Sequence, residues 1–207
     1  EVFKFIMTMH SKLRKLEQAG MDPKTTKGGK PVAWACPGLS AGIGTEIGLA
    51  CHKRFLANSP RAKVGLPEIL VGLFPGAGGT TRLVRMLGAM AASPLLLEGK
   101  MLNPKAARAA GLVDEIVEPE KLLESAKKWI LAADEDELVK AWDKKGYKMP
   151  GGNPYHPSGF MTFVGASAMV NSRTQGVYPA AKALLSVAYE GSLVPFDTAL
   201  KIEARWF

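Results

Sequence analysis

The sequence has few of the residues that build disulfide frameworks, metal centres or membrane spans. Its 207 residues include only two cysteines and three histidines. No run approaches the roughly 18 to 20 consecutive apolar residues of a membrane-spanning helix, so no membrane span is expected. Cys36 and Cys51 show no paired spacing, which predicts two reduced core residues in a cytoplasmic protein. His10, His52 and His156 are scattered along the chain, so we expect no metal site.

The excess of positive charge is not accompanied by a nucleic-acid-binding pattern. Lysine and arginine number 27 against 19 aspartates and glutamates, which gives a net charge of +8. These residues are spread along the chain, aromatic residues make up 8%, and no recognition-helix, RNP or zinc-finger pattern occurs. We therefore expect no nucleic-acid partner. The charge fits a solvated basic surface, or a small ligand that carries phosphates.

Apolar spacing and turn residues divide the chain into strands and helices. The segment 30–36 predicts a buried strand, 38–44 a glycine-rich turn and 112–117 a half-buried strand. A polar segment rich in Gly and Pro, residues 134–159, predicts a linker or an irregular surface segment. The expected helices cover residues 1–18, 45–56, 80–87, 91–97, 104–110, 119–133, 160–171, 179–191 and 195–207.

Two features suggest that the sequence is a fragment. Its amphipathic beginning has no initiating Met and no signal peptide, and its last residue, Phe207, falls within a helical pattern. The helices 160–171 and 179–191 carry apolar residues on more than one face, so we expect them to cover a second surface. These residues are Phe163, Val164, Leu184, Leu185 and Val187.

Two carboxylates, Glu46 and Glu68, stand out within residues 30–81, because each adjoins Gly or Pro and each precedes an apolar run. Glu46 is expected in the first turn of a helix, where the helix dipole favours a carboxylate. The unpaired N–H groups of the preceding glycine-rich turn could bind an anion or a polarised carbonyl. Two carboxylates in an apolar site can divide the acid and base roles of a reaction, since their pKa values can be separated.

Other readings of the same motifs fit less well. Gly42, Gly44 and Gly48 give the spacing G-x-G-x-x-x-G, and Glu68 follows Pro67 where a dinucleotide-binding fold would end a strand. A Rossmann oxidoreductase is therefore a minor alternative. No G-K-[ST] follows a glycine cluster, which excludes a P-loop, and no G-x-S-x-G nucleophile elbow is present. Taken alone, either glutamate could be an ordinary cap or surface residue.

Three consecutive segments resemble the crotonase (enoyl-CoA hydratase/isomerase) family. They are PVAWACPGLSAGIGTEIGLACHKRF, VGLPEILVGLFPGAGGTTRLVRMLG and GKMLNPKAARAAGLVDEIVEP, in family order over residues 30–118. The segment 174–207 is similar to the end of the hydratase portion of multifunctional fatty-acid oxidation enzymes, which continue into a 3-hydroxyacyl-CoA dehydrogenase. The resemblance implies an α/β crotonase-type ββα spiral whose N-terminal part is missing. It implies a hydratase core over 1–133, and a polar linker and helical segment over 134–207.

The resemblance also implies an activity and a set of site residues. The reaction is the hydration of a trans-2-enoyl-CoA to a 3-hydroxyacyl-CoA in fatty-acid β-oxidation. Glu46 and Glu68 are the catalytic acids, and the amides of Ile43 and Gly76 serve the oxyanion hole and the reacting water. The substrate-binding residues are Gly42, Gly44 and Pro67. The partners implied are acyl-CoA as substrate, and either further copies of the chain or a thiolase subunit. No cofactor is expected in this chain, and NAD would belong only to a dehydrogenase domain.

The sequence departs from the family pattern at Ile43, where the family usually has glycine or another small residue. β-Branched Ile resists positive φ. It therefore stays open whether the Ile43 amide points at the thioester oxygen and whether the thioester fits beside the Ile43 side chain. The family's other oxyanion amide falls upstream of Glu1. Two further functions also stay open. A double-bond isomerase of the same family needs a single acid at Glu68, and a non-catalytic acyl-CoA-binding or scaffolding module would need neither acid.

Overall fold

The protein was examined as a computed structural model that describes residues 1–207, except for the side chain of residue 173. The chain forms two compact units, each assembled from separate stretches of sequence. The helical unit comprises Glu1–His10, Leu66–Lys100 and Lys148–Phe207, and the strand unit comprises Ser11–Gly65 and Met101–Tyr147. The predicted division into a hydratase core and a linker at residue 134 concerns function and stays a prediction.

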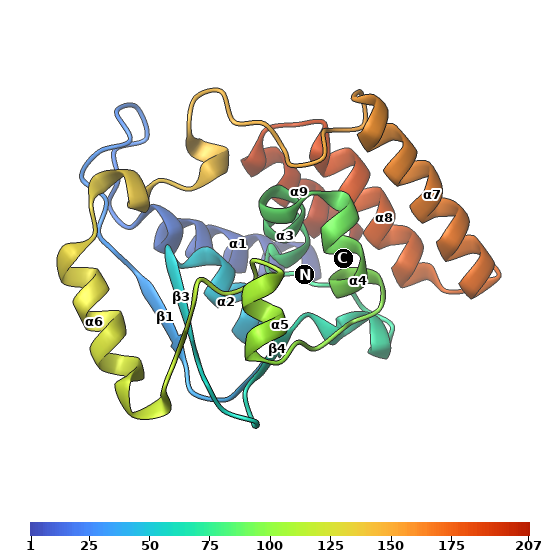
Figure 1. The fold of residues 1–207 in the computed structure, drawn as a ribbon. Coiled ribbons are helices and arrows are strands. Elements are labelled where there is room, and N and C mark those ends of the chain that lie inside the picture. The colour runs from blue at the N-terminus through green and yellow to red at the C-terminus, as the bar shows by residue number, and fades with distance from the viewer. The chain divides into compact units, whose positions relative to one another are not determined.

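All the strands belong to the strand unit and form two small parallel sheets. One sheet has the order β1-β3-β5, and the other pairs β2 with β4. Strands β1 and β3 lie side by side in Figure 1. The chain passes from β1 and β2 into α2, and then into β3 and β4, which is a ββα order. The strands are β1 Ala33–Cys36, β2 Leu39–Ala41, β3 Lys53–Ala57, β4 Lys63–Gly65 and β5 Glu115–Val117.

Helix α6 covers one side of the larger sheet. It runs beside β1 and β3 (Figure 1). Its Leu122 and Ala126 are buried against Phe55 and Ala57 of β3. Burying this apolar surface removes it from water and fixes the helix on the sheet. The helices of this unit are α2 Ile43–Ala50, α5 Pro104–Ala109 and α6 Leu122–Ala132, with the 3₁₀ turns η2 Pro119–Lys121, η3 Glu135–Leu138 and η4 Ala141–Asp143.

The prediction of one helix over 45–56 was wrong in its second half. Helix α2 ends at Ala50, and Lys53–Ala57 forms the central strand of the larger sheet, between β1 and β5. A short apolar run fits a buried strand as well as a helix, and pairing with distant strands decided between them. The predicted turn 38–44 also contains a strand, β2, which pairs with β4.

The helical unit packs its helices around α8. This helix contacts α3, α4, α7 and α9, and its Leu184 and Val187 are each 1% exposed. Phe163 of α7 is also buried, whereas Val164 is 48% exposed. The elements are η1 Pro67–Val71, α3 Gly79–Leu87, α4 Ala89–Leu97, α7 Pro157–Thr174, α8 Pro179–Ser192 and α9 Phe196–Trp206.

Helix α1, Val2–Gln18, was predicted correctly, and it buries two polar residues. Its buried residues are Ile6, His10 and Glu17, while Val2 and Phe3 are exposed. Polar groups can be buried in this way only when they are hydrogen-bonded or paired. Within the described part of the chain, no helix is long and apolar enough to cross a membrane.

Candidate functional site

The residues predicted to form the site divide between the two units. One set of residues lies at the junction of β2 and α2. A second set lies around η1 and the turn before α3. The first set is Gly42, Ile43, Gly44 and Glu46, and the second is Pro67, Glu68 and Gly76.

The junction of β2 and α2 leaves two backbone amides without a partner. Gly42 caps α2 and adopts φ 57° and ψ −126°, a conformation that only glycine takes readily. Its N–H donates to the Gly65 carbonyl at 3.1 Å, and its carbonyl accepts from the amides of Thr45 and Glu46. Among the described groups, no acceptor receives the amide of Ile43 or of Gly44. These are the first amides of a helix, where N–H groups have no intrahelical partner and can bind an anionic or polarised oxygen.

Ile43 is compatible with this geometry. The positive φ of the turn falls on Gly42, and the non-glycine residues with positive φ are Ala19, Thr26 and Gln175. Ile43 is the first residue of α2, and its side chain is 46% exposed. The backbone conformation therefore gives the amide of Ile43 no strain from its β-branched side chain.

Helix α2 is held close to the strands beneath it, and Glu46 is buried there. A Cβ atom on Gly48 would lie 2.9 Å from the Trp34 ring, so the absence of a side chain lets the helix approach the indole. Thr45 donates to the Ser40 carbonyl at 2.9 Å. Glu46 follows in the first turn of the helix and is only 3% exposed. The carboxylate and the two unpartnered amides thus belong to one short, tightly packed helix.

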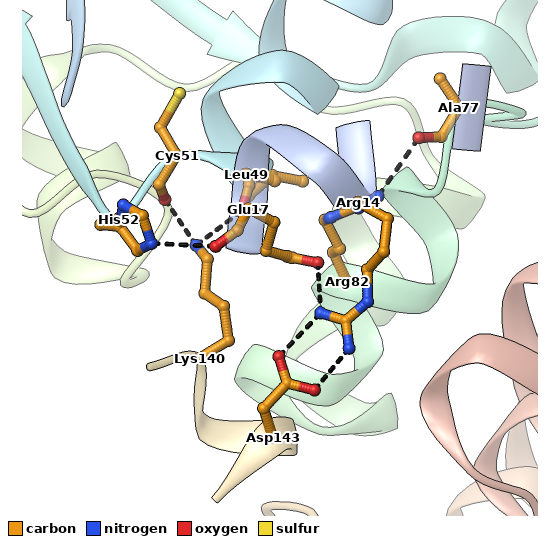
Figure 2. A network of polar contacts seen from close by, with 9 residues as sticks. All are labelled: Arg14, Glu17, Leu49, Cys51, His52, Ala77, Arg82, Lys140 and Asp143. Atoms are coloured by element: carbon orange, nitrogen blue, oxygen red, sulfur yellow. Dashed lines mark hydrogen bonds and ion pairs between the residues drawn. The ribbon is translucent and has the colours of Figure 1, made fainter. Parts of the chain in front are cut away.

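A buried lysine from the polar segment secures the other end of α2. Figure 2 shows Lys140 reaching the carbonyls of Leu49 and Cys51, with Nζ–O distances of 3.0 and 2.5 Å. A cation at the C-terminal end of a helix is favoured both by the free carbonyls and by the dipole. The segment 134–159 is irregular, as expected, yet it contributes a buried anchor to the helix that carries Glu46.

A second contact fastens the same segment to α1. Arg14 makes a bidentate ion pair with Asp143, at 2.7 and 2.5 Å, and also donates to the buried carboxylate of Glu17 at 2.8 Å (Figure 2). Burial lowers the pKa of His52, and the positive charge of Lys140 lowers it further. Neutral His52 accepts the Val32 amide at Nδ1 and contacts the Glu17 carbonyl through Nε2, at 3.0 and 2.9 Å.

Replacing Lys140 with methionine should destabilise the protein by about 1 to 3 kcal/mol, because buried carbonyls lose their donor. Methionine keeps most of the apolar stem, so the change isolates the ammonium. The measurement is the shift of the urea unfolding midpoint. Lys144→Met is the matched control, since Lys144 pairs with the 87% exposed Asp136 and surface pairs contribute little. Equal midpoints for the two variants would contradict the anchoring role of Lys140.

The second set of residues surrounds Glu68 in the helical unit. Pro67 begins η1, and Glu68 is the next residue, whose carbonyl accepts the Leu73 amide at 3.1 Å. The turn is also fastened by Tyr178, whose hydroxyl donates to the Ile69 carbonyl at 2.5 Å. Burial raises the pKa of Glu68, and the negative charge of Glu203 raises it further. Oε2 of Glu68 is buried and has no hydrogen-bond partner among the described groups.

Gly76 lies in the turn between η1 and α3, and it is enclosed by other residues of the helical unit. Its carbonyl contacts His10 Nε2 at 2.8 Å. A Cβ atom on Gly76 would lie 2.5 Å from ring atoms of Phe207, so no larger residue fits here. The Gly76 amide donates to no other described group. The helical unit therefore contains a carboxyl oxygen, Oε2 of Glu68, and a backbone amide, that of Gly76, which have no hydrogen-bond partner among the described groups.

Sequence reasoning missed three buried polar residues that support these two sets: His10, Lys140 and Glu203. Their partners lie 66, 91 and 125 residues away along the chain. For Glu203 a signal was available, since it follows Ala199 and Leu200 at helical spacing and all three are buried. Lys140 gave no such signal, because its segment has no periodicity. Across the described residues, no group of three or more His, Cys, Asp or Glu side chains could hold a metal ion.

Comparison with known proteins gives one family and a set of longer relatives. The family model described as enoyl-CoA hydratase/isomerase matches residues 11–141. The chain is 35% identical over 183 residues to the fatty acid oxidation complex subunit alpha of Shewanella amazonensis, covering 86% of this chain and 25% of that protein. The corresponding subunit of Vibrio campbellii is also 35% identical, over 177 residues with the same coverage. The chain thus spans about a quarter of the length of these relatives.

Solved structures agree on the fold. An enoyl-CoA hydratase of Bacillus anthracis has a TM-score of 0.52 and 26% identity, and the alignment covers 91% of this chain and 60% of that one. An enoyl-CoA hydratase of Geobacillus kaustophilus has a TM-score of 0.55 and 21% identity, with 98% and 58% coverage. The crotonase-type fold predicted from the sequence is therefore confirmed.

Proposed function

This chain belongs to the enoyl-CoA hydratase/isomerase family, and from that premise we propose that it is part of an enzyme that hydrates a trans-2-enoyl-CoA to a 3-hydroxyacyl-CoA. One observation carries the proposal above the others. Each of the two carboxylates, Glu46 and Glu68, is accompanied in its own unit by backbone amides that no described group accepts. Hydration needs these parts, because protons are both removed and delivered while an oxyanion is stabilised.

The proposed roles start from the raised pKa of Glu68. Glu68 has a raised pKa, so it holds its proton more firmly than an ordinary glutamate and can deliver it to C2. Glu46 takes a proton from the water whose oxygen bonds to C3. As the C2–C3 double bond is lost, negative charge develops on the thioester oxygen. The amide of Ile43 donates to that oxygen, and the amide of Gly76 donates to the attacking water.

The other predicted binding residues act through the backbone. Gly42 supplies the positive φ that turns the chain into α2, and Gly44 supplies a second free amide beside that of Ile43. Pro67 begins η1 and thereby sets the direction of Glu68. These roles require no cofactor. A polyphosphate-bearing substrate such as acyl-CoA also fits the excess of positive charge, +8 over the chain.

A double-bond isomerase is the second candidate, and Glu68 is the observation that favours it. Moving a double bond needs a single carboxylate that takes a proton from one carbon and returns it to another. Glu68 fits that role by itself, because it is protonated more readily than usual and one of its oxygens is unpartnered. A dedicated isomerase has no use for Glu46, so the need for Glu46 separates the two reactions.

The longer relatives suggest the setting of this activity. Because they are named as alpha subunits of a fatty acid oxidation complex, we propose that the chain acts in fatty-acid β-oxidation. A cytoplasmic location stays a prediction from the sequence. The chain would act as a homo-oligomer or together with a thiolase subunit. A dehydrogenase domain of the whole protein would be the part that uses NAD. The first test is whether the full-length protein hydrates a short trans-2-enoyl-CoA.

Replacing Ile43 with glycine should change turnover little, because the amide stays in place and the native backbone is unstrained. Glycine should cost about 0.5 to 1 kcal/mol of stability through its greater backbone freedom. Steady-state kinetics of the full-length protein and urea unfolding measure the two effects. Ile43→Ala is the control, since it removes the side chain and keeps a good helix former. A large loss of turnover in both variants would mean that the Ile43 side chain itself contacts the acyl group.

A further inference from the structure

The turn that carries Gly76 is held by a fully buried carboxylate from α9. Glu203 is 0% exposed, and it accepts the Gly78 amide at 2.6 Å. It also accepts the amide and the hydroxyl of Thr81, at 2.9 and 2.7 Å. Gly78 is the N-cap of α3 and has no capping side chain of its own. Glu203 therefore replaces the missing cap from 125 residues away, at the helix end where a negative charge is favoured.

His10 completes the attachment of the same turn from α1. Its side chain is 2% exposed, and Nε2 lies 2.8 Å from the Gly76 carbonyl and 3.5 Å from Glu203 Oε1. The Gly76 carbonyl can only accept, so Nε2 carries a proton and donates it to that carbonyl. Nδ1 is buried and has no hydrogen-bond partner within the described part of the chain. The turn is thus fixed at Gly76 by His10, and at Gly78 and Thr81 by Glu203.

Burying a carboxylate costs free energy of folding unless its oxygens are hydrogen-bonded. Glu203 receives three short hydrogen bonds, all from groups within four residues of one another, so the turn and the carboxylate fix each other. A leucine at this position would leave the buried amides of Gly78 and Thr81 without an acceptor.

We infer that Glu203 is a positioning residue of the proposed site, which fixes the turn bearing the Gly76 amide. This inference rests on the proposed function and deepens it. The negative charge of Glu203 adds to the effect of burial in raising the pKa of Glu68. Helix α4, which packs on η1, has no ionisable side chain over Ala89–Leu97.

The inference is tested with Glu203→Gln in the full-length protein, with Glu190→Gln as the matched control. Glu190 pairs with Arg205 at the surface, where the Arg205 side chain is 61% exposed. Glutamine keeps the size of Glu203 but removes the charge and presents an N–H₂ group to three donors. Amide hydrogen exchange of Gly78 and Thr81 should accelerate about tenfold or more, which corresponds to the loss of one or two buried hydrogen bonds.

The kinetic readout separates positioning from a merely structural role. In Glu203→Gln, kcat for hydration should fall about tenfold to a hundredfold, because the amide that donates to the oxyanion or the water is no longer correctly oriented. KM should stay within about threefold of the wild-type value. Without the negative charge the pKa of Glu68 should fall. The limb of the pH profile that reports Glu68 should therefore move to lower pH. The control variant should leave exchange, kcat and the pH limb unchanged.

The exchange and kinetic results separate a failure of the inference from a failure of the proposed function. Unchanged exchange in the turn, or an unchanged kcat for hydration, overturns the inference. If Glu203→Gln does not fold, Thr81→Val tests the same turn by removing one of the three donors. It should accelerate exchange at Gly78 by a smaller factor, and unchanged exchange there again overturns the inference. If the wild-type protein hydrates no enoyl-CoA while exchange responds as expected, the proposed function fails and the attachment of the turn stands.

Discussion

Replacing Glu68 with glutamine should lower hydration of a short enoyl-CoA by about 10²- to 10⁴-fold, the usual contribution of a positioned general acid or base. Glutamine has the same shape but holds no proton that it can deliver to C2. The measurement is kcat of the full-length protein, with loss of the conjugated enoyl thioester as the signal. Glu190→Gln, a change at a surface carboxylate, should be as active as the wild type.

Stability should not fall with activity in this variant. The raised pKa means that the folded state binds the Glu68 proton more tightly than the unfolded state does. The contribution of this group to stability is therefore present at acid pH and is lost as the pH rises through the raised pKa. Glutamine mimics the protonated form, so Glu68→Gln should unfold at the same urea concentration as the wild type at neutral pH, or at a higher one. If the Glu68→Gln variant kept near wild-type turnover, Glu68 would have no part in the mechanism.

Replacing Glu46 with glutamine should produce the second large effect, a loss of hydration by about 10²-fold or more, with the movement of a double bond retained. The water that attacks C3 must lose a proton to Glu46, whereas isomerisation needs only the Glu68 carboxyl. Both reactions are measured on one preparation, with a trans-2-enoyl-CoA and a 3-enoyl-CoA as substrates. Glu120→Gln on the exposed η2 turn serves as the control. Equal losses of both reactions would mean that Glu46 is needed for the fold or for binding. Unaffected hydration would favour the isomerase.

The parts of the fold that were predictable are those specified by local chemistry. Asn103 caps α5 with its side chain and Pro104 follows, while Gly111 adopts the positive φ expected after a helix. Such signals act over a few residues, so they can be read from the sequence. The boundary between α2 and β3 could not be read, because pairing of Lys53–Ala57 with strands on both sides determines it.

The acids of the candidate site could be predicted from the sequence, but the distant residues that hold their surroundings in place could not. Glu46 and Glu68 adjoin turn residues that mark them locally, and their assignment as the two catalytic acids stays a prediction that the variants above test. Lys140 and Glu203 come from distant segments, and each serves backbone groups near one of those acids. No short-range pattern links a lysine in a polar segment to the end of a helix that lies 91 residues earlier.

The most direct test of the proposed hydration is to follow both protons and oxygen in a single turnover of the full-length protein. A trans-2-enoyl-CoA is incubated with the enzyme in water labelled with heavy oxygen and deuterium, and the thioester product is examined by mass spectrometry and NMR. We expect a 3-hydroxyacyl-CoA with labelled oxygen on C3 and one deuterium on C2, formed by the wild type and not by the Glu46→Gln, Glu68→Gln double variant. A product whose double bond has moved without gaining labelled oxygen, or a substrate that binds and is recovered unchanged, would contradict the account.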